Sequence, residues 1–569
     1  MNYIYKLIPV FLLCPSILVA QTAPDYCGTN DGPENHSLTI QGDGEFITSH
    51  GTLNVLVVFV RFPDDNGASN HWPASGFPSL TSSFIDSTTT QNSTNYVNIT
   101  NYFDQMSLGQ FNVIGDVVTT TATNSSDYYI TDSSFVDNKW EYTYDRYNAT
   151  KDVLISLDND VVFSKYDNWT NSESFQNSNS SDGIVDMIFM VWKGSWFGGW
   201  RGEASLGYGS DILVDNDSTT IKTRYRTSLG SGKYKSGGSG VTIHDNSGSG
   251  TLLNSVKHEL GHYLLGSGHP YGSFQNRIAS MMQWGEPSGR STNAEERERL
   301  GWISVPEITQ NSSNIELDDF ITTGDAYKYD ITPGNGSDYE YLYFENHQKL
   351  SIYDDATRNS SDKGLIVLHD KASNKTSEFV RYLLTDGDWD FENVYPYAIE
   401  HPSPSNASIL PVWEKVNPDP SNFGDNMSRR RYVFIQNSPN TNDTTIRQFV
   451  YALKEDGNIT VEPFFQGVNI TSTFNPDKYS TLSKITNPKT REFNSSNGPD
   501  FYMNVVSQTG NKLYVDFEVN HDPYTINENT DWDRQIFLDN SASISNSAVL
   551  TLAPETGIYS NTTGGIVVV

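Results

Sequence analysis

Cysteine is nearly absent from this chain of 569 residues, which contains only Cys14 and Cys27. The first twenty residues place Lys6 ahead of an apolar run, 7–19, and end on Ala20, a pattern typical of a secretory signal peptide (1–20). Cleavage after residue 20 would remove Cys14 and leave Cys27 alone, so no intrachain disulfide could form. Stability must then come from packing or from bound ions.

Positive charge is also scarce. The chain has 37 Lys and Arg against 69 Asp and Glu, which gives a formal net charge of −32 and a sequence pI of about 4.6. Such a surplus repels nucleic-acid phosphates and anionic lipid headgroups, so we expect no nucleic-acid partner. The acidity favours a solvated extracellular or salt-adapted surface.

Long hydrophobic runs are missing after the signal. No later segment reaches the roughly 20 apolar residues that a membrane-spanning helix needs. We therefore expect a secreted, extracellular protein without a membrane span. Its residues are 36% hydrophobic and 12% aromatic, enough for several buried cores.

The pattern of the first half predicts an α+β domain over 50–305, preceded by a polar N-terminal arm or short propiece (21–49). LNVLVVFVRF (53–62) is continuously apolar and rich in valine, as a buried central strand is. FNVIGDVVTT (111–120) and IVDMIFMVWKG (184–194) predict further strands. One long helix should begin near Leu252 and pack against their sheet.

The second half predicts β structure. Residues 306–522 alternate short apolar runs with turn signals and contain no convincing amphipathic helix, so we expect one or more β-rich, sandwich-like domains. The tail, 523–569, resembles the opening turn of a parallel β-helix. Because it ends on bare apolar residues, we expect it to begin a further repeat domain.

The chemistry is concentrated in VKHELGHYLLGSGH (256–269). On a helix, His258 and His262 lie one turn apart on the same face, so both imidazoles can reach one metal ion. Glu259 is rotated away from that face, out of direct coordination but near a water at the metal. The pattern predicts a Zn²⁺ site with Glu259 as the catalytic residue.

A third metal ligand is harder to place. His269 would lie about 10 Å too far along a continuous helix, so the chain must turn, and Gly266 or Gly268 can provide that turn. We predict His269 as the third ligand. A surface-loop histidine is the alternative, and the rival ligands are glutamates later in the chain: Glu286, Glu295 and Glu296.

Several segments in order resemble the M6 family (immune inhibitor A-like) of secreted metallopeptidases. They are LNVLVVFVRFPDD (53–65), YVNITNYFDQMSLGQFNVIGDVV (96–118), DGIVDMIFMVWKG (182–194), the HExxH helix, ASMMQWG (279–285), EERERLGWI (295–303), YLYFENHQ (341–348) and KGLIVLHD (363–370). The resemblance implies a zincin- or metzincin-like catalytic domain and a zinc endopeptidase acting on extracellular protein or peptide substrates.

The resemblance has one departure. The metzincin pattern is HExxHxxGxxH, whereas here Leu265 stands at the glycine position and Gly268 at the third histidine position. Glycine and histidine are shifted together by one residue, which we interpret as a lengthened last helical turn. The resemblance also implies that Met281 or Met282 forms a methionine turn beneath the metal; ordinary core filling is the alternative.

Other interpretations stay open. The Cys27 thiolate could occupy the metal before activation, or Cys27 could be a bystander. Structural Ca²⁺ is compatible with Asp64, Asp65, Asp182 and Asp186, although no EF-hand spacing supports it. The alternative function is a catalytically inactive surface adhesion or glycan-binding protein on the same scaffold.

Overall fold

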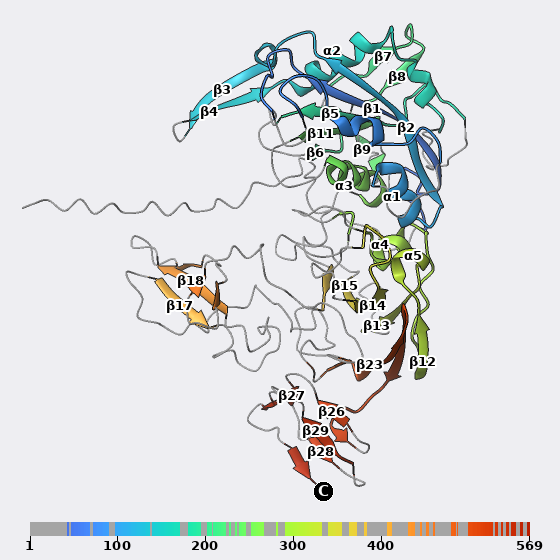
Figure 1. Cartoon of the computed structure of the whole chain (residues 1–569), viewed down its shortest axis with the longest axis vertical. Coiled ribbons are helices and arrows are strands. Elements are labelled where there is room, and N and C mark those ends of the chain that lie inside the picture. Colours follow the sequence, from blue (N-terminus) through green and yellow to red (C-terminus); the bar gives the residue numbers. More distant parts are fainter. Residues whose placement is uncertain are drawn as a thin grey trace, which may run out of the picture.

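The computed structural model describes residues 42–568 apart from a series of gaps, the longest being 90–96, 171–179, 195–201, 246–251, 267–279, 283–290, 333–339, 355–362, 372–379, 384–406, 412–430, 438–443, 461–479 and 487–498. The described chain is mixed α and β, with many strands and few helices, as the α+β prediction requires (Figure 1). None of its described helices is long and apolar enough to cross a membrane.

The N-terminal half is built on a five-stranded sheet. Its strand order is β2-β1-β5-β11-β6, where the strands are β1 (Gly51–Arg61), β2 (Phe111–Thr121), β5 (Ile188–Lys193), β6 (Gly202–Glu203) and β11 (Gly240–Asp245). Strands β1, β2, β5 and β11 are parallel, and β6 runs antiparallel to β11 at the end of this order. The strands predicted at 53–62, 111–120 and 184–194 are confirmed.

Helices cover both faces of this sheet (Figure 1). Val55, Val57 and Phe59 of β1 belong to a core shared with α1 (Ile99–Met106) and α3 (Leu252–Leu265). The alternate residues, among them Leu56 and Val58, belong to a second core shared with α2 (Arg146–Leu157). Burial on both faces explains why β1 is continuously apolar.

Helix α2 was not predicted. Its sequence, RYNATKDVLISL, mixes polar and β-branched residues without a clear apolar stripe, so periodicity gave little signal. Asp145 begins the helix, because its side chain accepts a hydrogen bond from the Asn148 amide at 3.0 Å.

Helix α3 begins where the sequence predicted. Val256, Leu260 and Tyr263 are buried against the sheet, and the Tyr263 hydroxyl donates to the Gly240 carbonyl at 2.8 Å. The helix ends at Gly266, whose φ of 89° is accessible to glycine without strain and whose amide donates to the His262 carbonyl. Gly266, one of the two glycines expected to provide the turn, therefore ends the helix.

The last residues of the predicted N-terminal arm are packed into the protein. Ser49 is buried, and its hydroxyl donates to the Leu300 carbonyl at 2.6 Å. The Trp302 indole N–H donates to the Ser49 carbonyl at 2.8 Å. The predicted arm, 21–49, therefore contributes its last residue to the packing of the domain.

Shorter elements complete the N-terminal half. They are the hairpin β3 (Ile130–Val136) and β4 (Lys139–Tyr144), the hairpin β7 (Ile212–Val214) and β8 (Thr219–Ile221), the pair β9 (Thr227–Ser228) and β10 (Tyr234–Lys235), and three 3₁₀ turns, Ser79–Ser83, Ser126–Tyr129 and Phe163–Tyr166.

Two antiparallel sheets follow and share one apolar core, as a sandwich does. The first has the order β12 (Ser312–Leu317), β24 (Lys512–Val519), β23 (Phe501–Thr509), β22 (Thr481–Ser483), and the second has the order β13 (Ala326–Asp330), β14 (Glu340–His347), β15 (Gly364–Lys371), β16 (Val380–Tyr382). Leu342 and Phe344 of β14 pack against Phe501 and Phe517 in this core. Tyr343, between them in sequence, belongs to the core around α3 instead.

A further antiparallel sheet contains β17 (Ala407–Pro411), β18 (Arg431–Asn437), β19 (Thr444–Ile446), β20 (Tyr451–Leu453) and β21 (Ile459–Thr460). The tail contains β25 (Thr525–Ile526), β26 (Thr530–Trp532), β27 (Ile536–Leu538), β28 (Ala542–Ile544), β29 (Leu550–Leu552), β30 (Ile558–Ser560) and β31 (Ile566–Val568). These tail strands pair in parallel as β25-β28-β31, β26-β29 and β27-β30, the sense of pairing found in a β-helix.

Two short helices connect the halves: α4 (Ala294–Arg299) and α5 (Phe320–Thr323). Neither was predicted, because each has less than two turns. Between them and β14 lies a buried ionic network. His347 contacts Asp354 at 2.8 Å through Nδ1 and Glu345 at 2.9 Å through Nε2, and all three side chains are fully buried. Arg297 lies close by and donates to the Phe320 and Ile321 carbonyls.

This network makes stability depend on pH. Burial alone would lower the pKa of His347, but the charges and hydrogen bonds of Asp354 and Glu345 outweigh it and raise the pKa to about 10. In the unfolded chain the pKa of a histidine is about 6.5. The folded state therefore gains stability from protonated His347 below about pH 6.5 and loses it as the pH rises towards 10.

We predict that the free energy of unfolding, measured by urea denaturation between pH 6.5 and 9.5, falls more steeply for the wild type than for a His347→Gln variant. His521→Gln, at a partly exposed histidine paired with Glu518, serves as control and should keep the wild-type slope. Equal slopes for His347→Gln and the wild type would contradict the prediction.

Candidate metal centre

Helix α3 brings the two histidines of the HExxH motif together. Their ring centroids are 4.9 Å apart, and the ring planes are nearly perpendicular at 87°. His262 is fully buried, and His258 is partly exposed. As the four-residue spacing predicts, both imidazoles lie on one side of the helix.

Each imidazole is oriented by a hydrogen bond to a backbone carbonyl. The Nδ1 atom of His258 lies 3.2 Å from the Met281 carbonyl oxygen, and the Nδ1 atom of His262 lies 3.0 Å from the Gly266 carbonyl oxygen. A carbonyl only accepts, so each Nδ1 carries the proton and each neutral ring has its lone pair on Nε2. This is the form in which histidine binds a metal.

The partial enclosure of His258 by the protein favours this neutral form. Desolvation lowers its pKa to about 4, and the hydrogen bond to Met281 opposes that shift only partly. A protonated imidazole has no lone pair for a metal, so the low pKa of His258 favours binding at neutral pH.

Glu259 is buried beside the histidines. Its Oε2 atom lies 3.9 Å from Nε2 of His262. The edge strand β6 approaches it closely at Gly202: a Cβ atom on this glycine would lie 2.6 Å from the Glu259 Cγ. Only glycine allows the strand to lie so near to the carboxylate.

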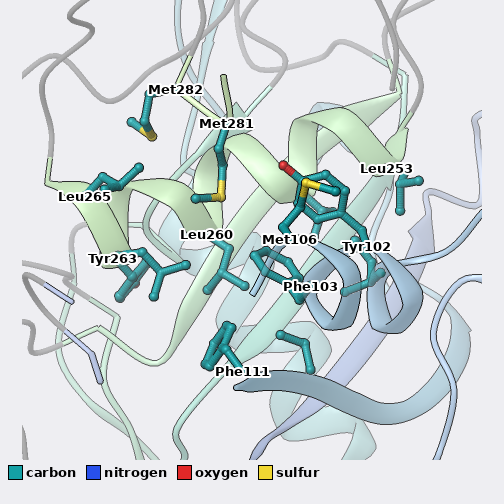
Figure 2. Packing of buried hydrophobic residues seen from close by; sticks show 14 of the residues in the cluster. Tyr102, Phe103, Met106, Phe111, Leu253, Leu260, Tyr263, Leu265, Met281 and Met282 are labelled. Carbon is teal, nitrogen blue, oxygen red and sulfur yellow. The ribbon is translucent and has the colours of Figure 1, made fainter. Parts of the chain in front are cut away.

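Met281 and Met282 pack beside α3 (Figure 2). Both are buried, and a Cβ atom on Gly261 would lie 2.7 Å from the Met282 sulfur and 3.0 Å from the Met281 Cγ. Gly261 lies between Glu259 and His262 in sequence, so the two thioethers rest against the part of the helix that carries the site. This position is compatible with the predicted methionine turn and also with its alternative, ordinary core filling, since both methionines belong to the core around α3.

Glu296, on α4, holds these methionines. Its carboxylate accepts hydrogen bonds from the Ser280 hydroxyl at 2.6 Å, the Met281 amide at 3.0 Å and the Met282 amide at 3.3 Å. The sequence named Glu296 only as a rival metal ligand. Its role in binding the turn could not be read from spacing, because the contact joins residues 14 to 16 positions apart across a segment without periodicity.

Of the residues proposed as third ligand, His269 and Glu286 lie outside the described residues. Glu295 and Glu296 are both buried on α4. Among the residues that the structure describes, no three His, Cys, Asp or Glu side chains are grouped so as to hold a metal ion. The identity of the third ligand stays a prediction, and Cys27 also lies outside the described part.

The four aspartates considered for Ca²⁺ lie at opposite ends of the parallel strands β1 and β5. Asp64 accepts hydrogen bonds from Ser126, and Asp65 lies 3.6 Å from the Lys193 ammonium, both after β1. Asp182 and Asp186 precede β5. Burial, with the nearby charges of Asp167 and Asp182, raises the pKa of Asp186 to about 8. The four therefore do not form one site.

No model of a known protein family matches the chain, and no curated protein matches it either. The two Nδ1 hydrogen bonds, the neighbouring imidazoles and the adjacent buried carboxylate fit a zinc ion, since zinc binds well to the nitrogen of a neutral imidazole.

The packing of α3 on the methionines generates a prediction. Gly261→Ala places a methyl group against both thioethers, and such overpacking costs about 1–3 kcal/mol. The roughly 1 kcal/mol gained when alanine replaces a helical glycine offsets only part of this. We expect urea denaturation to show a net loss of stability for Gly261→Ala, and a smaller loss when the same substitution is made in a Met282→Ala background, where the clash with the Met282 sulfur is gone.

Gly67→Ala is the matched control, because a Cβ there has no atom within 4 Å. If Gly261→Ala were as stable as the wild type, the described contact between the turn and the helix would be wrong.

Proposed function

We propose that this protein is a secreted zinc-dependent endopeptidase that hydrolyses peptide bonds of extracellular proteins. The observation that carries the proposal is the pair of Nδ1 hydrogen bonds on His258 and His262, which give both Nε2 atoms the lone pair that a metal requires. Nothing in a solvated helix face would require both histidines to be fixed in the same tautomer.

His258 and His262 would hold the zinc, with His269 as the proposed third ligand. When bound, zinc supplies a Lewis acid that polarises the scissile carbonyl and acidifies water. The burial of His262 and the low pKa of His258 favour these residues as neutral ligands.

Glu259 is the proposed general base. Its carboxylate lies 3.9 Å from the His262 Nε2 atom, close to the proposed metal position. It would accept a proton from the attacking water and pass it to the departing amine, as general acid–base catalysis requires. Its place between β6 and α3 keeps bulk water away from one side of the carboxylate.

Strand β6 supports a peptide as substrate. It is the last strand in the described order of the sheet, and it lies directly beside Glu259 at Gly202. An extended peptide can add to a sheet edge through main-chain hydrogen bonds, which places its carbonyls along the edge. Such a peptide would pass close to the proposed metal position.

The sheet also supports a zincin- or metzincin-like catalytic domain. Four parallel strands, an antiparallel edge strand and a helix carrying the two histidines lie together, with the methionines of 281–282 against that helix. Of these features, the resemblance to the M6 family implies the sheet, the HExxH helix and the methionines near it. Secretion rests on the predicted signal peptide, which lies outside the described residues.

The alternative function is an inactive adhesion or glycan-binding protein whose β-rich half is the working part. The large β region, with its two-sheet core and parallel-strand tail, is the observation in its favour. A site that had lost its activity would not need a buried Glu259 beside β6, nor two histidines whose Nδ1 atoms are both hydrogen-bonded. We therefore favour the peptidase.

The test uses Glu259→Gln. This variant should retain about one zinc per chain, because Glu259 is not a ligand, and should lose cleavage of casein by at least 100-fold, within the range that general acid–base catalysis supplies. Phenanthroline should abolish wild-type cleavage. Glu307→Gln, at an exposed glutamate, is the control and should cleave as the wild type does.

The alternative function predicts a different result: zinc-free protein, or zinc-loaded protein that cleaves no peptide yet binds a polysaccharide array. Either result would overturn the proposal.

A further inference from the structure

A continuous set of hydrogen bonds leads from Glu296 to His258. The peptide unit between Met281 and Met282 stands in the middle. Its N–H, on Met282, donates to Glu296 Oε1 at 3.3 Å, and its carbonyl, on Met281, accepts from His258 Nδ1 at 3.2 Å. One peptide group thus connects the carboxylate with the imidazole.

Ser280 strengthens this connection. Its hydroxyl donates to Glu296 Oε1 at 2.6 Å, and the oxygen of this hydroxyl accepts from the Met282 amide at 2.9 Å, so the Met282 N–H is shared between Ser280 and Glu296. The Met281 amide donates to the other carboxylate oxygen at 3.0 Å. Because these groups are buried, each hydrogen bond polarises the next, and the carbonyl that faces His258 becomes a better acceptor.

The carboxylate itself is held firmly. The Asn293 side chain begins α4 by accepting a hydrogen bond from the Glu296 amide at 2.9 Å. Glu345 of β14 accepts from the Ala294 amide at 2.6 Å, next to His347. The second sheet therefore anchors α4, and α4 presents Glu296 to the methionine turn.

We propose that Glu296 is a positioning residue: acting through the Met281–Met282 peptide group, it fixes the tautomer and orientation of His258 and thereby sets the affinity of the centre for zinc. The inference rests on the proposed function, since zinc is the expected metal. Histidine ligands are commonly oriented by a carboxylate or carbonyl bonded to the second ring nitrogen, and loss of such a partner typically weakens metal binding by about 10–100-fold.

The same contacts argue against Glu296 as the third zinc ligand. Its two oxygen atoms accept from three donors in the turn, at 2.6, 3.0 and 3.3 Å. A carboxylate turned towards a metal would leave the buried Met281 amide without this acceptor, which is costly, and the Met282 amide with Ser280 alone.

The test compares Glu296→Gln with the wild type. The NH₂ group of glutamine is a donor and would face the Ser280 hydroxyl or the Met281 amide, which are donors too. We therefore expect the zinc dissociation constant, measured by competition with a chelating dye, to rise about 10–100-fold. In the metal-free protein, long-range ¹H–¹⁵N spectra of the imidazoles should show His258 as a single Nδ1–H tautomer in the wild type and as a mixture in the variant.

Glu298→Gln is the matched control. Glu298 is a buried glutamate of the same helix, but it contacts Lys328 at 2.8 Å and Tyr343 at 2.9 Å rather than the turn. This variant should lose stability without a change in the His258 tautomer or a comparable loss of zinc affinity. If Glu296→Gln does not fold, Ser280→Ala serves as a milder test. It should also weaken zinc binding.

The outcomes separate the two proposals. Equal zinc affinity and an unchanged His258 tautomer in Glu296→Gln would overturn the positioning role while leaving the peptidase intact. An equal loss of zinc affinity in Glu298→Gln would also overturn it, as a general effect of instability. A wild type without zinc would overturn the peptidase, and the imidazole spectra would still decide whether Glu296 positions His258.

Discussion

The proposed metal centre depends on two hydrogen bonds, each from the Nδ1–H of a histidine to a backbone carbonyl. They determine which nitrogen of His258 and His262 carries the lone pair, and so whether two side chains on one helix act as a metal site or as two ordinary buried polar groups. Both acceptors lie outside α3 proper: one is Gly266, where the helix ends, and the other is Met281, in the turn that packs on the helix.

The rest of the fold places those two carbonyls. The parallel sheet buries α3 along one side, and the Tyr263 hydroxyl fixes it to β11. Gly266 ends the helix in a conformation that glycine adopts without strain. The Met281 carbonyl is placed by Glu296, which the second sheet holds through Glu345. The β-rich half thus helps to position the proposed metal centre, although His258 and His262 both lie on α3 in the other half.

Sequence reasoning was strongest where one periodicity dominates. The apolar runs of β1 and β5 correctly indicated buried strands. The spacing of His258 and His262 correctly indicated that both lie on one face of α3. Sequence reasoning failed for α2, which lacks an apolar stripe, and for α4, which is too short to show one. Only tertiary contacts revealed the role of Glu296 and the close approach of Gly202 to Glu259, since neither depends on local spacing. His269 lies outside the described residues, so its part in the centre remains a prediction from the sequence.

The most direct test of the central claim is an anomalous difference map at the zinc absorption edge, from crystals of the purified protein grown with zinc. The account predicts a single strong peak within about 2.0–2.1 Å of Nε2 of both His258 and His262, and the same map would show which side chain completes the coordination. A map with no peak between these two imidazoles, or with zinc bound elsewhere on the chain, would contradict it.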